Sequence, residues 1–216
     1  MLTEFHRDIT RSVLAPCFTD EAVEIAVRAN DEQDRLRGQI AHAEYHVDNA
    51  VPPGYAYMLA QKRAALDAFR RGDCETGMRS LGRCLHAVQD FYSHTHYVRL
   101  WLAQNGGAAQ ATPERIPPLL DWLAVPDIQT GRITLQEALT YLPLVGRLFA
   151  HLLTMPADSH FALNLDGPHR GAEFAFVLEA ARKHSGHIVE EVRQQIVASC
   201  IAPALPCVRQ SVSPLP

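Results

Sequence analysis

The sequence lacks the cysteine pattern that marks disulfide-rich and zinc-ribbon proteins. Its five cysteines form no CxxC pair, and an odd count in a chain of 216 residues does not suggest a disulfide framework. We therefore expect reduced, buried thiols. Cys200 and Cys207 are close enough in sequence to meet, which is weak support for a bridge between them.

A strong excess of one charge and long apolar runs are also missing. The net charge of -4 provides no general attraction for nucleic acid or anionic lipid. The longest apolar run, 138–153, contains Pro143 and Arg147 and falls short of the ~20 residues that a bilayer span needs, so we expect no transmembrane segment. The N-terminus carries charge from Glu4 onward and has no apolar signal-peptide core, which favours a cytoplasmic location and leaves export by another route open.

What the sequence does contain is a helical pattern. Hydrophobic residues make up 47% of the chain and recur with helical period almost everywhere, while no stretch alternates with period two. We predict an all-α protein with a single domain, 1–216, and an insertion rich in glycine and proline at about 100–160. The expected helices are 3–14, 20–38, 55–71, 76–93, 134–153 and 170–199. Expected helix caps are Thr19 with Asp20, Asp73, and Thr134 with Glu137.

The eleven histidines are the most informative feature, and they are densest in LGRCLHAVQDFYSHTHYV, residues 81–98. His86, Asp90 and His94 follow i, i+4 steps, so on a helix two imidazoles and a carboxylate can converge. His96 is an alternative ligand if the helix ends or bends after Tyr92, because a straight helix aims it about 120° away from Asp90. Imidazole nitrogens and carboxylate oxygens suit zinc. The competing interpretation, a surface helix with scattered histidines, is disfavoured by the apolar residues between them.

Three further clusters could supply ligands. DGPHRGAEF places His169 and Glu173 at i, i+4 in an expected helix, although this pair alone is more often solvated. AHAEYHVDN supplies His42, His46 and Asp48, for which a polar loop is an equally good interpretation. At the N-terminus, the α-amine of Met1 can lose its proton and bind a metal together with His6.

Taken in order, HRDIT, the histidine–aspartate pair, LHxxQDxxxHxH and DGxHxxxE resemble the zinc-dependent phospholipase C superfamily. This superfamily includes the fungal single-strand nucleases and the Het-C heterokaryon-incompatibility proteins, and the segments here resemble the Het-C branch most. The resemblance implies a helical bundle of the phospholipase C type with two or three zinc ions. Its pattern assigns Asp48, His86 and Asp90 to one ion, His96, His169 and Glu173 to a second, and Met1 with His6 to a third that Asp90 bridges.

The sequence departs from that pattern at two positions. The family has a tryptophan at the mature N-terminus, where this chain has Met1, which retains the backbone ligands. A family histidine is missing between Asp48 and His86, so His46 or His42 substitutes for it or the first ion lacks a ligand. The choice between His94 and His96 stays open.

The resemblance implies a zinc-dependent phosphodiesterase, a phospholipase C of the phosphatidylcholine type, in which a metal-activated water attacks phosphorus. Asp48 is the candidate catalytic residue, either as the general base or as the group that orients this water. Glu4, Tyr55 and Tyr57 are candidates for contact with the cationic choline. An amphipathic stretch, 135–153, permits peripheral membrane contact, although burial in the bundle is favoured. One alternative is a 3′-nucleotidase or single-strand nuclease on the same ions, the only interpretation with a nucleic-acid partner. The other is a Het-C-like, non-enzymatic interaction protein with structural zinc.

Overall fold

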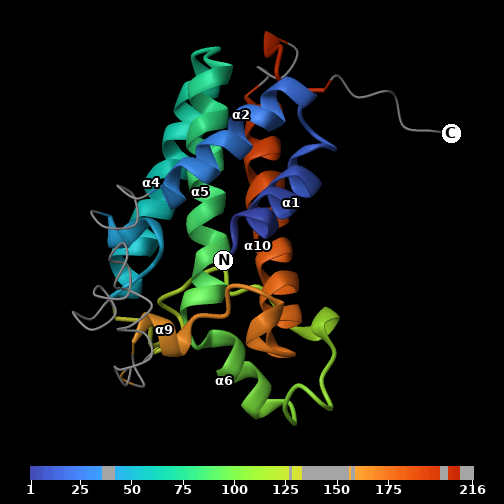
Figure 1. Cartoon of the computed structure of the whole chain (residues 1–216). Helices are drawn as coiled ribbons and strands as arrows, with labels where there is room; N and C mark the ends of the chain where they lie inside the picture. The colour runs from blue at the N-terminus through green and yellow to red at the C-terminus, as the bar shows by residue number, and fades with distance from the viewer. Residues whose placement is uncertain (36–41, 127, 133–155, 157–158, 200–203, 210–216) are drawn as a thin grey trace, which may run out of the picture.

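The computed structural model describes residues 1–35, 42–126, 128–132, 156, 159–199 and 204–209. Within these residues the chain is all-α, as predicted, and no strand is present beyond isolated bridges. The helices are α1 (Thr3–Leu14), α2 (Asp20–Asp31), α4 (Val51–Arg70), α5 (Cys74–His94), α6 (Tyr97–Gln104), α9 (His160–Leu163) and α10 (Glu173–Ala198). Figure 1 shows α4, α5, α2, α1 and α10 forming a bundle, with α6 and α9 at one end of it.

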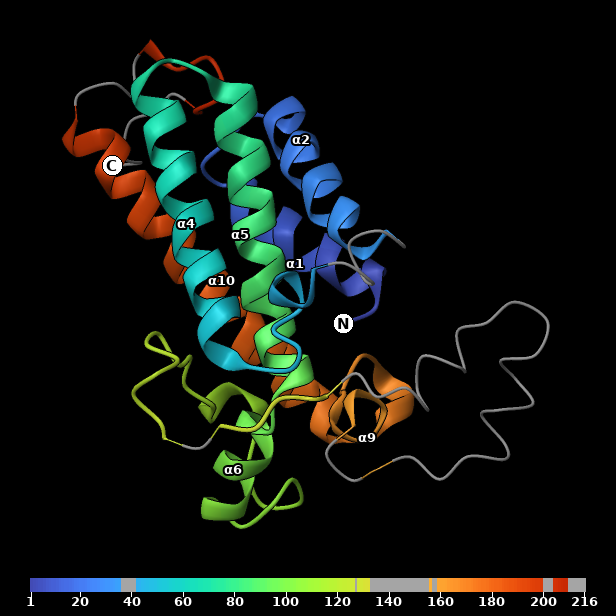
Figure 2. The same ribbon diagram turned by 90° about the vertical axis from the view of Figure 1, so that its left-hand side faces the viewer.

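Helix α5 is the centre of the bundle. Its N-cap is Asp73, whose side chain accepts a hydrogen bond from the backbone N–H of Thr76 at 3.0 Å, so the predicted cap is confirmed. Its second half is buried on every side from Cys84 to His94, which is typical of a helix surrounded by others. Helices α4, α2 and α10 pack against it, and Figure 2 shows α4 and α5 side by side along their length. The buried residues include His86, Asp90 and His94.

The crossing of α2 over α5 depends on a residue without a side chain. A Cβ added at Gly82 would lie 2.1 Å from the carbonyl oxygen of Ala26. Contacts between Cβ and backbone at this distance do not occur, so only glycine lets the two helices approach so closely. This approach places the end of α2 beside the buried half of α5.

Several predicted helix boundaries differ from the structure. The second helix ends at Asp31 rather than at 38 and is followed by a 3-10 turn, Glu32–Asp34. Helix α4 begins at Val51, four residues before the predicted start at 55. Pro52 and Pro53 are tolerated there, because the N–H groups of a first helical turn have no partner within the helix. Helix α6 was not predicted, and Thr19 makes no side-chain cap. The predicted helix 134–153, its capping box and the amphipathic stretch lie outside the described residues.

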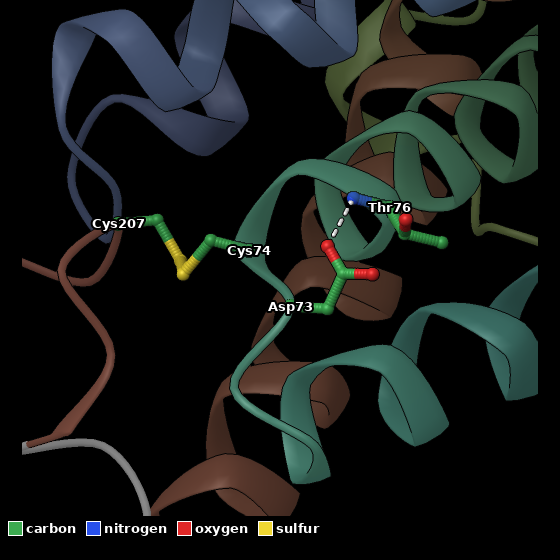
Figure 3. The surroundings of a disulfide bond; sticks show 4 residues. All are labelled: Asp73, Cys74, Thr76 and Cys207. Carbon is green, nitrogen blue, oxygen red and sulfur yellow. Dashed lines mark hydrogen bonds between the residues drawn. A yellow bond between two sulfur atoms is a disulfide. The ribbon is translucent and has the colours of Figure 1, made fainter.

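The expectation of reduced thiols is wrong for two cysteines. Cys74, the first residue of α5, forms a disulfide with Cys207, 133 positions further along the chain (Figure 3). The segment around Cys207 also contacts the turn between α1 and α2. The carbonyl of Cys207 accepts a hydrogen bond from the N–H of Thr19 at 2.9 Å, and the Arg209 guanidinium donates one to the carbonyl of Phe18 at 2.7 Å. Cys17 and Cys84 are free, and Cys200 lies outside the described residues. Sequence spacing cannot reveal such a distant pair.

A buried histidine joins α5 to α10. The N–H of Leu119 donates to the hydroxyl oxygen of Tyr92 at 2.9 Å, so the Tyr92 O–H is free to donate to Nδ1 of His184, also at 2.9 Å. Burial, with His187 and Lys62 nearby, lowers the pKa of His184 to about 3, so the ring is neutral and can accept this bond. Among the described helices, none is long and apolar enough to cross a bilayer.

The helix crossing at Gly82 predicts that Gly82→Ala destabilises the protein, by about 1–3 kcal/mol or more, because the added methyl group forces α2 and α5 apart. Gly186→Ala is the matched control. It lies in α10, where an added Cβ meets nothing closer than Val13 at 3.9 Å, so it should stabilise the helix by about 0.5–1 kcal/mol. Urea denaturation of both variants measures these changes, and equal effects would contradict the close approach.

The neutral state of His184 predicts a pH dependence of stability. The unfolded chain takes up a proton below its ordinary pKa of ~6.5, whereas folded His184 does so only near pH 3, so the free energy of unfolding falls as pH falls through this window. The slope contributed by this group is at most about 1.4 kcal/mol per pH unit. His184→Gln should remove that slope while keeping an acceptor for Tyr92. Denaturation at pH 7, 6, 5 and 4 tests this, and parallel curves for the two proteins would refute it.

Candidate metal centre

Polar groups from distant parts of the chain meet around the carboxylate of Asp90, which is fully buried. On one side, Oδ2 lies 2.9 Å from Nδ1 of His46 and 3.0 Å from Nε2 of His86. On the other side, Oδ1 lies 2.7 Å from the α-amine of Met1 and 3.1 Å from Nε2 of His6. Asp34 completes the group. We refer to His6, Asp34, His46, His86 and Asp90 as the Asp90 cluster.

Four atoms of this cluster have the spacing of zinc ligands. Nδ1 of His46 and Nε2 of His86 are 3.2 Å apart. Oδ1 of Asp34 lies 3.8 Å from the His86 nitrogen and 3.9 Å from the His46 nitrogen. Tetrahedral ligands at ~2.0–2.2 Å from zinc lie about 3.3–3.6 Å from one another. The distances, from 2.9 to 3.9 Å, bracket that range, so the residues present fit the ion.

A second layer of amides fixes which histidine nitrogens face Asp90. Nδ1 of His86 lies 3.0 Å from Oδ1 of Asn30, and Nδ1 of His6 lies 2.6 Å from Oε1 of Gln89. Amide oxygens only accept, so both Nδ1 atoms carry a proton, and both Nε2 atoms are turned toward the cluster. A donor bond of this kind on the far nitrogen is typical of metal-ligating histidines.

His6 shows a further feature of a ligand. Its Nε2 lies close to Asp90, yet at an angle that makes no hydrogen bond, and it has no other partner although it is buried. Two ligands of one ion lie near each other in this way, because each lone pair points at the ion and not at the neighbouring ligand.

The α-amine of Met1 is the main cation beside Asp90. It lies 2.7 Å from Oδ1 of Asp90, 2.9 Å from Oδ1 of Asp166 and 3.4 Å from Nε2 of His94. Burial alone would lower the pKa of this amine, but the carboxylates of Asp166 and Asp90 outweigh it and raise the pKa to about 11. Burial likewise favours a neutral Asp90, while the amine and the histidines hold its pKa well below the usual value.

A second group of ligand types lies next to the first. Oδ1 of Asp48 is 2.9 Å from Nδ1 of His160 and 3.4 Å from Nδ1 of His94. Burial would raise the pKa of Asp48, but His94 and His160 lower it to about 2. We refer to Asp48, His94 and His160 as the Asp48 cluster.

Of the residues singled out from the sequence, the structure brings together Met1, His6, His46, Asp48, His86, Asp90 and His94. It places the expected ligands of the second ion elsewhere. His169 lies in a separate 3-10 turn, Pro168–Arg170, and Gly171 in a left-handed conformation breaks the chain before α10, so His169 and Glu173 are not i, i+4 neighbours on one helix. Glu173 instead accepts from Arg99 at 3.0 Å.

The remaining candidates also have other partners. His96 follows the end of α5, and its Nδ1 accepts from the N–H of Gln129 at 2.9 Å. His42 pairs with Glu44, Tyr55 packs against Trp122, and the Tyr57 hydroxyl bonds the amide of Gln33. Glu4 is exposed. None of these contacts joins them to the Asp90 or Asp48 cluster.

Three residues of the site were missed. Asp34 turns inward only because α2 ends three residues before it, and the predicted helix ran through that point. His160 and Asp166 belong to no spacing pattern that the sequence shows. A signal was present for Asp166, which lies in the same NLDGPH segment as His169.

Comparisons with known proteins point to one group. Residues 9–107 match the family model described as the VWA7 N-terminal domain. Among curated proteins, von Willebrand factor A domain-containing protein 7 from Mus musculus is 32% identical over 98 residues, 43% of this chain and 11% of the relative. The Homo sapiens protein of that name is 36% identical over 74 residues, 34% of this chain and 8% of the relative. The chain thus matches about a tenth of their length. No solved structure matches.

These similarities overturn the resemblance to the zinc-dependent phospholipase C superfamily. The similarity of the chain to the VWA7 N-terminal domain overturns the expected phospholipase C and phosphodiester hydrolase activity. The nuclease and Het-C alternatives depended on the same resemblance. Histidine and aspartate at helical spacing report ligand chemistry, which unrelated families share, and they do not report a reaction. The matched range does include Asp34, His46, His86 and Asp90.

The amide layer predicts that Asn30→Leu destabilises the protein by about 1–3 kcal/mol, because it leaves the buried Nδ1–H of His86 without an acceptor. Asn105→Ala is the matched control, since the Asn105 amide makes a single bond, to the carbonyl of Trp101, at a half-buried position. The control should lose about 1 kcal/mol or less. Urea denaturation of both variants measures the loss in free energy of unfolding. A smaller loss for Asn30→Leu than for the control would contradict the proposed role of the amides.

Proposed function

We propose that this chain is a metal-binding helical domain whose Asp90 cluster holds zinc. The observation that supports the proposal most is the spacing of four ligand atoms, from His46, His86, Asp90 and Asp34, which lie 2.9–3.9 Å from one another in the measured pairs. Two imidazole nitrogens with two carboxylate oxygens form a donor set that zinc prefers, whereas magnesium and calcium take oxygen ligands.

The two sides of Asp90 differ in what they can accept. The Oδ2 side faces two histidine nitrogens and Asp34, with no resident cation among the described residues. The Oδ1 side is already in contact with the α-amine of Met1, so an ion bound there with His6 would require that amine to lose its proton. We therefore assign the first zinc ion to the Oδ2 side. A second ion on the Oδ1 side would share Asp90 and use His6 and Met1.

The proposed role of the ion is structural. Its ligands come from the turn after α2, from the segment before α4 and from α5, so one ion would join three segments that are far apart in sequence. When bound, zinc supplies positive charge to a fully buried carboxylate. Because the unfolded chain cannot present these ligands together, the binding free energy of the ion adds to the free energy of folding.

Zinc binding is testable by metal analysis of the purified protein. We expect at least one zinc ion per chain, and we expect His86→Ala to lose it. His169→Ala is the matched control, because His169 is an exposed histidine outside the cluster and its loss should leave the zinc content unchanged. Re-adding zinc at about 100 times its dissociation constant should stabilise the stripped protein by about 2.7 kcal/mol.

For a chain of this size, that stabilisation corresponds to an increase in melting temperature on the order of 5–10 °C. Differential scanning calorimetry with and without chelator measures it. A folded protein that is purified free of metal, takes up no zinc and melts at the same temperature in both conditions would rule out the proposal.

A further inference from the structure

We infer that the Asp48 cluster is a second metal site, separate from the Asp90 cluster, which binds a divalent transition-metal cation through Asp48, His94 and His160 and leaves one coordination position open. The inference extends beyond the proposed function and does not require zinc at Asp90. It is based on ligand geometry, on the backbone that builds the cluster, and on the position of His160.

The ligand atoms are already gathered. Oδ1 of Asp48 lies 2.9 Å from Nδ1 of His160 and 3.4 Å from Nδ1 of His94, and one ligand atom from each residue lies within 4.8 Å of the others. The two imidazole rings are nearly perpendicular, with centroids 4.4 Å apart. Two imidazoles and one carboxylate favour zinc and its first-row neighbours over magnesium or calcium.

The backbone on either side of Asp48 is strained. The residues on either side of it, Val47 and Asn49, have φ angles of 57° and 66°. A β-branched residue such as valine rarely adopts this left-handed conformation, which costs on the order of 1–3 kcal/mol, and such strain is concentrated at functional sites. A simple aspartate–histidine ion pair would not require it.

One segment, residues 129–132, holds all three ligands in place. Thr130 donates through its hydroxyl to the carbonyl of Val47, and the carbonyl of Gly131 accepts from the N–H of Asn49 at 3.0 Å. The N–H of Gly131 donates to the carbonyl of His94 at 3.1 Å. The carbonyl of Arg132 accepts from the N–H of His160 at 3.0 Å. The segment therefore connects the loop before α4, the end of α5 and the start of α9.

A glycine is required where this segment meets His160. A Cβ at Gly131 would lie 2.4 Å from the Cα of His160, so no larger residue allows the approach. On the other side, the hydroxyl of Ser159 caps α9 by accepting from the N–H of Ala162 at 3.2 Å. These two contacts fix the position from which the His160 ring reaches Asp48.

His94 is oriented by a second carboxylate. Its Nε2 lies 3.1 Å from Oδ1 of Asp166, which accepts the N–H and leaves Nδ1 on the side of Asp48. This Nδ1 also lies 2.9 Å from the carbonyl oxygen of His46, to which it donates a proton when no ion is bound. A bound cation would take the place of that proton.

Three protein ligands leave a fourth position of a tetrahedral ion for water or for a donor from another molecule. The side chain of His160 is 13% exposed, whereas Asp48 and His94 are 4% and 6% exposed, so solvent reaches the cluster from the side of His160.

The inference is tested by titrating chelator-stripped protein with Zn²⁺ alone, followed by isothermal calorimetry and metal analysis. We expect His160→Ala to bind one ion fewer than the wild-type protein, or to bind that ion more than about tenfold more weakly. His169→Ala is the matched control, because His169 is an exposed histidine outside both clusters, and this variant should bind as the wild type does.

A comparison with His86→Ala separates this inference from the proposed function. If His86→Ala keeps an ion that His160→Ala lacks, the Asp48 cluster is a site of its own. If His160→Ala binds every ion that the wild type binds, the inference is overturned, while zinc at Asp90 can still hold. If only His160→Ala loses an ion, the proposed function fails and the inference stands. Should His160→Ala not fold by circular dichroism, Asp48→Asn, which keeps the size and one acceptor of Asp48, replaces it with the same expected loss.

Discussion

The structure is organised around one buried negative charge. The Asp90 carboxylate has no exposure to solvent, and an isolated charge in that position would cost many kcal/mol. It is stabilised because positive or polar groups reach it from the start of the chain, from α1, from the segment before α4 and from its own helix. The contacts that stabilise this buried carboxylate therefore fix the path of the chain at this end of the bundle.

The sequence allows the fold class and the core of the site to be predicted, because both depend on short-range spacing. Helical periodicity is enough for an all-α fold, and i, i+4 steps on α5 place His86, Asp90 and His94 along one row. Local spacing fails where a helix stops. Asp34 becomes part of the site only because α2 ends at Asp31, and His169 is separated from Glu173 by the left-handed Gly171. His160 is brought in by tertiary contacts with the 129–132 segment, which no periodicity reports.

Family and location were harder to infer than chemistry. Ligand-type residues in the right order pointed to a hydrolase superfamily, yet the similarity over 9–107 is to the VWA7 N-terminal domain. The cytoplasmic location, which was inferred from the lack of a signal-peptide core, stays a prediction. The disulfide between Cys74 and Cys207 is a bond that is typical of oxidising compartments. Contact with a membrane or with a partner protein also stays a prediction.

The disulfide also determines how the domain would respond to mechanical tension. The two cysteines are 133 positions apart, and the bond between them shields the intervening chain from the applied force, which locks about 450 Å of contour length. Pulling on the chain outside this loop could extend only the residues before Cys74 and after Cys207. His6, Asp34, His46 and Asp48 lie in the extensible part, while His86, Asp90, His94 and His160 lie in the shielded loop. Force would therefore act directly across the two ligand clusters. An ion bound in either cluster would resist extension, because it would link residues of the extensible part to residues of the shielded loop.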